Sequence, residues 1–228
     1  MSRRKKRKFI RSFVLFVLSA FFICIGALAL WVATMKIPDL NNFTTRVVTQ
    51  STKIYDRTGA ILLYDVNTDT KRTVVPLSEI SLNLQKATIA VEDSDFYNHF
   101  GVRPMAILRA AIDDVLSGKV NQGGSTITQQ VVKNSLLTQD KTIARKIKEL
   151  VLAIKLEKVM TKDQILEAYF NEISYGGTIY GAEEASQAFY GKPVKDISLA
   201  EAAYMAAIPQ APTYYSPYGT HREELNNR

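Results

Sequence analysis

The sequence is poor in the residues that most metal and disulfide sites need. It has one cysteine, Cys24, and two histidines, His99 and His221. A single cysteine excludes an intrachain disulfide and a cysteine-based metal site. Two histidines without an HExxH pattern are too few for a histidine-rich zinc site. His99 is therefore interpreted as a hydrogen-bonded structural residue.

Two familiar catalytic patterns are also missing. Ser-x-x-Lys occurs only at Ser2 to Lys5, and Lys-Thr-Gly does not occur. The serine acylation chemistry of β-lactam targets is therefore excluded from this chain. A P-loop is excluded as well, because the adjoining glycines before Lys133 do not have its spacing.

The folded part has no excess of positive charge. Of the 29 lysines and arginines, seven lie within residues 1–11, which contain no acid. The remaining 22 balance the 22 aspartates and glutamates, so the net charge of +7 comes wholly from this segment. A nucleic-acid-binding domain would carry its basic excess on the folded part, so no nucleic-acid partner is expected.

One long apolar run is present. Residues 12–35 contain no charge, which is enough helix to cross a hydrocarbon core. Basic residues before it predict that 1–11 form a cytoplasmic tail and that the chain from about Lys36 lies outside. A cleaved signal peptide is the alternative, because Ala27 to Ala29 has a small-x-small form. The apolar run continues through Leu30 to Val32, which favours an uncleaved transmembrane anchor.

Residues 36–75 change to short β-like runs. The runs TKIYD and ILLYDV flank a turn at Arg57 to Ala60, in which Gly59 is free to take a positive φ. We expect a membrane-proximal hairpin and linker in this region.

From Pro76 onward the signals become helical. Pro104 opens a helical pattern that ends before Gly118. Residues 143–160 are amphipathic, and the expected core face consists of Ile147, Leu150, Val151 and Ile154. Capping boxes are predicted from Thr161 with Gln164 and from Ser198 with Glu201. The fold class expected is mainly α.

Three stretches could form a site. VEDSDFYNHFG, residues 91–101, holds three carboxylates and a histidine. It is either part of a site or a helix end that runs into a solvated loop. NQGGSTITQQVVKN, residues 121–134, interrupts the helices with poor helix formers. It is either a flexible linker or a loop that binds a phosphate or pyrophosphate, with Lys133 nearby. In ARKIKE, Arg145 and Glu149 can pair at i and i+4, or the segment is an ordinary solvated face.

The blocks EDSDFYNHFG, GGSTITQQVVKN, RKIKE, ILEAYFNEISYG and AEAAYMAAIPQAP occur in this order. Together they resemble the five sequence blocks of the peptidoglycan glycosyltransferases, the lipid II polymerases. This family comprises monofunctional enzymes and the N-terminal domains of class A penicillin-binding proteins. The resemblance covers about Leu77 to Pro217.

The resemblance implies a lysozyme-like helical lobe with a small membrane-proximal jaw. The glycosyltransferase domain would span residues 76–220, and residues 221–228 would begin a linker to a further domain. The implied substrates are lipid II and the growing glycan on polyprenyl pyrophosphate. Other implied partners are the membrane and cell-wall synthesis proteins.

The implied reaction is an inverting displacement that forms a β-1,4 bond and releases polyprenyl pyrophosphate. Glu92 matches the family's proposed general base, and burial and neighbouring Asp93 would raise its pKa. Lys133, Arg145 and Lys146 match positions that contact the pyrophosphate. Glu149 matches a second acid, which would bind a divalent cation (Mg or Mn), orient a cation or act on the donor side. No organic cofactor is implied.

The resemblance also implies supporting roles. Phe96 would pack beneath the base, with Asp93 beside it, and Ser125, Gln129 and Gln130 would line the donor cleft. Glu167 and Asn171 are expected to hold the fold. The family pattern is not followed at Ser94, Asp95 and Arg103, so the electrostatic environment of Glu92 is expected to differ from that in other members. A lysozyme-like peptidoglycan hydrolase and a non-catalytic membrane-anchored scaffold are the alternatives.

Overall fold

The computed structural model describes residues 3–34, 40, 43, 50–66, 71–117, 124–138, 140 and 142–228. The chain forms two compact units, Met1–Pro38 and Asp39–Arg228. Three predicted features lie outside the described residues: the end of the apolar run at Met35, the helix-ending Gly118 and the start of the 121–134 stretch.

The first unit is one helix, α1 (Arg3–Thr34). Its part Arg11–Thr34 is long and apolar enough to cross a membrane, and no other helix among the described residues passes this test. The helix also includes most of the basic segment that was expected to form a tail. The prediction of an apolar helix here is confirmed, and its insertion in a membrane stays a prediction.

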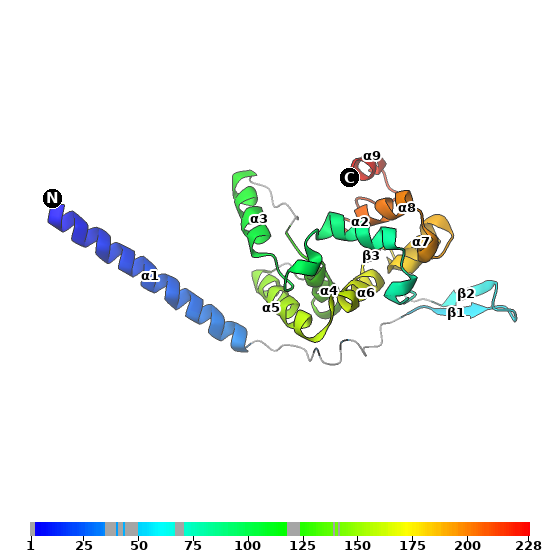
Figure 1. The fold of residues 1–228 in the computed structure, drawn as a ribbon, viewed down its shortest axis with the longest axis horizontal. Coiled ribbons are helices and arrows are strands. Elements are labelled where there is room, and N and C mark those ends of the chain that lie inside the picture. Colours follow the sequence, from blue (N-terminus) through cyan, green and yellow to red (C-terminus); the bar gives the residue numbers. More distant parts are fainter. Residues whose placement is uncertain are drawn as a thin grey trace. The chain divides into compact units, whose positions relative to one another are not determined.

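The second unit begins with the predicted hairpin. Strands β1 (Thr52–Tyr55) and β2 (Leu62–Val66) pair antiparallel and project beyond the helices (Figure 1). Gly59 has a φ of +74°, as the turn required. The Asp56 carboxylate accepts hydrogen bonds from the Thr58 hydroxyl at 2.7 Å and from the Ile61 N–H at 3.0 Å. These bonds, that of Thr58 foremost, lower the pKa of Asp56 and close the loop.

Helices form most of the remainder, so the prediction of a mainly α fold is confirmed. The helices are α2 (Leu82–Glu92), α3 (Pro104–Ser117), α4 (Ile127–Leu136), α5 (Ile143–Val159), α6 (Lys162–Glu172), α7 (Ala182–Tyr190), α8 (Leu199–Ala207) and α9 (Arg222–Asn227). A second two-stranded sheet pairs β3 (Ser174–Gly176) with β4 (Ile179–Tyr180). Short 3-10 turns cover Leu77–Glu79, Phe96–Asn98 and Val194–Asp196.

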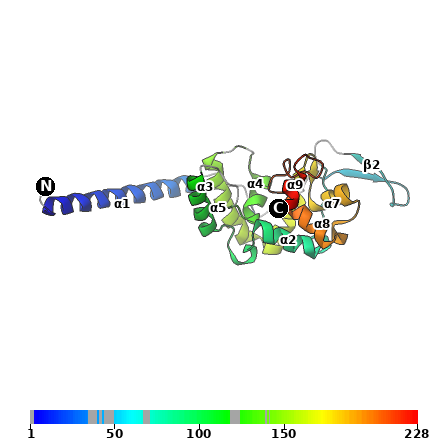
Figure 2. The same cartoon turned by 90° about the horizontal axis from the view of Figure 1, so that it is seen from above.

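The core is built around α4. This helix packs against α5 and α6, and α2 packs against α8, as Figures 1 and 2 show. The fully or nearly fully buried apolar residues of α4, α5 and α6 are Ile127, Val131, Val132, Leu152, Ala153, Leu156, Ile165, Leu166, Tyr169 and Phe170. Burying side chains of this size stabilises a fold by about 1.5–3 kcal/mol each.

The core face predicted for α5 was wrong. The buried residues are Glu149, Leu152, Ala153 and Leu156, whereas Ile154 is exposed. The buried stripe keeps the helical spacing of three and four but includes a carboxylate. Because a charged residue is assigned to the solvent face in a periodicity argument, the stripe was placed on the wrong side of the helix.

Capping explains where three helices begin. The boxes predicted at Thr161 and Gln164 and at Ser198 and Glu201 are both present. A third box, Thr126 with Gln129, opens α4. The prediction that residues 121–134 are irregular was therefore wrong from Ile127 onward, because the cap and the packing of α4 outweigh the weak helix propensity.

Glycine is required where the first motif crosses α5. Gly101 has a φ of +85°, and a Cβ there would lie 2.6 Å from the Ala153 carbonyl oxygen. The Gly101 carbonyl also accepts a hydrogen bond from the Thr126 hydroxyl at 2.6 Å. This close backbone contact places the first motif against both α5 and the start of α4.

Two polar residues hold the fold as predicted. The Glu167 carboxylate accepts a hydrogen bond from the Leu77 N–H at 2.8 Å. The Asn171 amide accepts from the Val75 N–H at 3.0 Å and donates to the Val75 carbonyl at 2.9 Å. Residues 222–227, expected to be linker, instead form α9, whose Leu225 is buried.

Candidate active site

Glu92 is the last residue of α2, and both of its carboxylate oxygens are occupied. Oε2 accepts a hydrogen bond from Gln130 Nε2 at 2.7 Å, and Oε1 accepts from Arg228 Nη2 at 3.2 Å. The side chain of Glu92 is 9% exposed. The structure thus brings Gln130, which was predicted to line the donor cleft, beside Glu92, and adds Arg228, which the sequence did not indicate.

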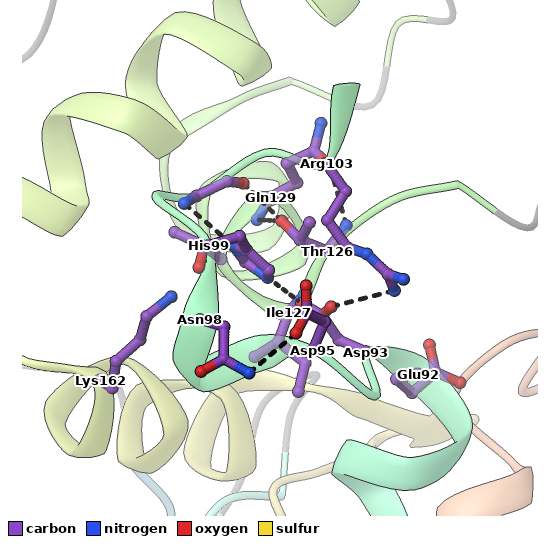
Figure 3. Close-up of polar contacts among 12 residues, drawn as sticks. Glu92, Asp93, Asp95, Asn98, His99, Arg103, Thr126, Ile127, Gln129 and Lys162 are labelled. Atoms are coloured by element: carbon purple, nitrogen blue, oxygen red, sulfur yellow. Dashed lines mark hydrogen bonds and ion pairs between the residues drawn. The ribbon is translucent and has the colours of Figure 1, made fainter. Parts of the chain in front are cut away.

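Asp93 has a different environment from its neighbour. Its fully buried carboxylate accepts hydrogen bonds from His99 Nε2 at 2.8 Å and from the Ile127 N–H at 3.1 Å, and it pairs with Arg103 at 3.5 Å (Figure 3). Glu92 is drawn beside this cluster and is not joined to it. Asp93 therefore supports Glu92 through the backbone by fixing the end of α2 to the first turn of α4.

The tautomer of His99 follows from its two neighbours. Its Nδ1 accepts a hydrogen bond from the Gly101 N–H at 3.1 Å, so the ring proton lies on Nε2 and is donated to Asp93. The ring is buried and meets Phe96 edge to face. The structural role predicted for His99 is confirmed.

Phe96 forms the floor of this region. Its side chain is fully buried, and the ammonium of Lys162 lies 4.6 Å from the centre of its ring. So complete a burial fits a packing role, whereas a position of Phe96 beneath the Glu92 side chain stays a prediction.

The two glutamines of α4 differ in their surroundings. Gln129 is fully buried, and its Oε1 accepts the Thr126 N–H at 2.8 Å as part of the capping box. Its Nε2 has no hydrogen-bond partner among the described residues. Gln129 thus caps the helix and does not line an open surface, whereas Gln130 faces Glu92.

A second cluster joins Ser125 to the start of α5. Lys146 Nζ contacts the Glu149 carboxylate and donates to Ser125 Oγ at 2.8 Å. Arg145 Nη1 lies 3.7 Å from Glu149 Oε2, which confirms the predicted i, i+4 pair. Glu149 is only 2% exposed, so the alternative of an ordinary solvated face is wrong.

This cluster does not fit a protein-held divalent cation. Both oxygens of Glu149 face cationic side chains, those of Lys146 and Arg145. In the described part of the chain, no group of three or more His, Cys, Asp or Glu residues could hold a metal ion. Divalent cations prefer several oxygen ligands, so we derive no step from a metal at Glu149.

Lys133 differs from Arg145 and Lys146 in having no acidic partner among the described residues. It lies in the last turn of α4, one turn beyond Gln130, and is exposed. Within the described residues it makes no ion pair. An unpaired ammonium close to Gln130 is available to an anionic ligand.

Two buried tyrosines, Tyr169 and Tyr175, are affected by the charge of Glu92, and sequence reasoning assigned them no role. Burial raises the pKa of Tyr169 and of Tyr175, and the nearby Glu92 carboxylate raises both further. Both phenols are therefore neutral, and the Tyr169 hydroxyl has no partner among the described residues. Their positions in ILEAYFNEISYG could have indicated a place near the site, because aromatic residues flank the acidic and amide side chains of that block.

The three residues that depart from the family pattern, Ser94, Asp95 and Arg103, have different surroundings. Ser94 and Asp95 are exposed, and Asp95 accepts a hydrogen bond from Asn98 at 2.8 Å. Arg103 instead pairs with Asp93 at 3.5 Å. The unusual arginine therefore supplies positive charge to the buried carboxylate, while the other two lie in solvent.

Comparison with known proteins gives a consistent result. The model of one protein family, described as transglycosylase, matches residues 60–228. The chain is 40% identical over 216 residues to penicillin-binding protein 1A of Aquifex aeolicus, covering 94% of this chain and 29% of that protein. It is 40% identical over 219 residues to penicillin-binding protein 1F of Bacillus subtilis, covering 95% and 30% respectively. The chain thus spans less than a third of the length of these relatives.

Replacing the buried carboxylate tests the role of Asp93. Asp93→Asn should lower the free energy of unfolding by roughly 2–4 kcal/mol, because it removes the charge that His99, Arg103 and the Ile127 N–H stabilise. Asp95→Asn is the matched control, and its exposed site predicts a change within about 0.5 kcal/mol. Denaturant unfolding of the detergent-solubilised protein measures both. Equal losses in the two variants would contradict the assignment.

Proposed function

Because the chain belongs to the transglycosylase family, to whose peptidoglycan glycosyltransferases its five sequence blocks are similar, we propose that it polymerises lipid II into β-1,4-linked glycan. One observation gives this proposal most support. Gln130 of α4 contacts Glu92, and Ser125, just before α4, contacts Lys146. A carboxylate suited to act as base and a cluster of cations thus adjoin one short helix.

In the proposed reaction Glu92 is the general base. The 4-hydroxyl of the acceptor GlcNAc loses its proton to Glu92, and its oxygen forms a bond with the anomeric carbon of the donor MurNAc. The bond from that carbon to the pyrophosphate oxygen breaks, and the configuration inverts. The surroundings of Glu92 support this role, because its side chain is mostly buried and is held by two donors.

The departing polyprenyl pyrophosphate gains negative charge that needs stabilisation. We assign this role to Lys133, Arg145 and Lys146. Arg145 and Lys146 both contact Glu149, which favours a role of Glu149 in orienting these cations. A buried acid that holds two cations in place keeps them preorganised for an anionic ligand.

The substrates are lipids, so the domain should work at a membrane surface. Helix α3 exposes apolar side chains at helical spacing, namely Met105, Leu108 and Ile112, and Phe100 nearby is 81% exposed. An exposed apolar face of this kind fits contact with the bilayer. Cell-wall synthesis proteins remain expected partners.

Substitution of the base tests the proposed reaction directly. Glu92→Gln should reduce polymerisation of purified lipid II by about 10²–10⁴-fold, because the amide cannot accept the proton. Glu79→Gln is a suitable control, since Glu79 is an exposed acid paired with Lys195. Gel separation of the glycan products measures both.

The possible results of this experiment separate the functions. Sugar fragments released from finished glycan, without consumption of lipid II, would indicate a hydrolase. Binding of lipid II that is equal in wild type and Glu92→Gln, with polymer from neither, would indicate a scaffold.

The cation on α4 can be tested in the same assay. Lys133→Ala should lower the rate of polymerisation by about 100-fold, as expected when one group that stabilises developing charge is removed. Its free energy of unfolding should change by less than about 0.5 kcal/mol, because the side chain is exposed. Lys158→Ala, at an exposed lysine in the last turn of α5, should leave both quantities unchanged. A Lys133→Ala protein of normal rate would refute the pyrophosphate role.

The proposed orientation places the N-terminus in the cytoplasm and the second unit outside the cell membrane, with α1 as the anchor. Protease added to sealed right-side-out vesicles should digest the domain and leave a tag on the N-terminus intact. Protection of the domain, or release of a soluble domain lacking residues before Leu30, would contradict an uncleaved anchor of this orientation.

A further inference from the structure

The second donor to Glu92 comes from the far end of the chain. Arg228 follows α9, and its Nη2 donates to Glu92 Oε1 at 3.2 Å across 136 positions of sequence. The same guanidinium donates through Nε to the Ala207 carbonyl at 3.1 Å and lies 5.6 Å from the centre of the Tyr215 ring. Three contacts from different elements therefore determine where the guanidinium lies.

Helix α9 is itself packed on the domain. Leu225 is 2% exposed, and α9 contacts α8. The Arg228 N–H continues the helical hydrogen-bonding pattern by donating to the Glu224 carbonyl at 3.2 Å. The position of Arg228 thus depends on a buried apolar contact as well as on its own side chain.

The pair differs from an ordinary surface ion pair. The Arg228 side chain is 21% exposed and that of Glu92 is 9% exposed. Charges removed from solvent to this degree are screened less by water and salt than exposed ones. The contact can therefore affect the behaviour of Glu92 in a way that most surface pairs do not.

The charge balance around Glu92 also depends on this contact. Gln130 of α4 and Arg228 contact the carboxylate, and the buried phenols of Tyr169 and Tyr175 are near enough for its charge to raise their pKa values. Burial keeps the two phenols neutral, and the amide carries no charge. Among the described residues, Arg228 is the one cation that pairs with Glu92.

We propose that Arg228 is a positioning residue that keeps the Glu92 carboxylate oriented toward the acceptor hydroxyl. This inference rests on the proposed function of Glu92 as general base. Gln130 and Arg228 hold opposite oxygens, so together they fix the plane of the carboxylate, which either contact alone would leave free to rotate.

The test compares kcat and KM for polymerisation of lipid II by Arg228→Gln, Arg228→Lys and Arg222→Gln. Arg222 is a matched control, because it is an exposed arginine of the same helix that contacts the Pro217 carbonyl. Thermal unfolding of each variant in the same detergent shows whether the domain remains folded.

Arg228→Gln should lower kcat by about tenfold, the effect expected for loss of one hydrogen bond to a charged group. KM for lipid II should stay within about twofold, since Arg228 acts through Glu92. Arg228→Lys should restore part of kcat, because lysine keeps a charged donor but lacks the planar fork. Arg222→Gln should match the wild type.

Several outcomes would overturn the inference. Unchanged kinetics of Arg228→Gln would do so, and a faster Arg228→Gln would identify the contact as inhibitory. A slower Arg228→Gln that also has a lower unfolding temperature and a higher KM would assign Arg228 a purely structural role. In the Glu92→Gln background, Arg228→Gln should cause no further loss, and an additional tenfold loss would also refute action through Glu92.

Failure of the proposed function would look different. An inactive wild type, or a fully active Glu92→Gln, would refute the base assignment and with it the inference. An active wild type with an inactive Glu92→Gln and an unaffected Arg228→Gln would refute the inference about Arg228 alone.

Discussion

The hydrogen bond from the Ile127 N–H to the Asp93 carboxylate is the contact on which the arrangement of the site depends. It joins the C-terminal end of α2 to the first turn of α4 at 3.1 Å. The N–H groups of a first helical turn lack partners within the helix, and the helix dipole favours negative charge there. A buried carboxylate at this position satisfies the helix and is in turn stabilised by His99 and Arg103. Because Glu92 directly precedes Asp93, the same contact fixes the backbone from which Glu92 projects.

Helix α4 then relates the parts of the site to one another. Ser125 precedes it and contacts Lys146, Gln130 in its first half contacts Glu92, and Lys133 lies one turn further on. The core side chains Val131 and Val132 lie between these polar residues and are buried. The spacing between Glu92 and these cations is therefore set by the geometry of a packed helix and not by a loop. Such rigidity is what preorganised stabilisation of charge requires.

The sequence predicted elements whose signals are local, and it failed where a contact is distant. The caps at Thr161 and Ser198 were readable because each lies three residues before its partner side chain. The equivalent signal at Thr126 and Gln129 was present but was outweighed by the adjacent glycines. The buried stripe of α5 was misplaced because burial of Glu149 depends on Lys146, Arg145 and the tertiary packing of that face.

For the site, the sequence indicated candidate residues but not the contacts between them. Motif resemblance found Glu92, Gln130 and the cations, but no rule of spacing indicated that Gln129 would be buried in a cap. The contact between Arg228 and Glu92 joins residues 136 positions apart, which periodicity and capping rules cannot relate.

The occupancy of the Glu92 oxygens has a consequence for the design of inhibitors. A carboxylate oxygen has two lone pairs, and among the described residues each oxygen of Glu92 accepts one hydrogen bond. A neutral hydroxyl group on a small molecule can therefore bind to Glu92 as an additional donor while both protein contacts stay in place. A cationic group would compete with the Arg228 guanidinium for the same charge, and its binding would have to offset the loss of that contact. Compounds that present a neutral hydroxyl should consequently be better matched to this carboxylate than amines.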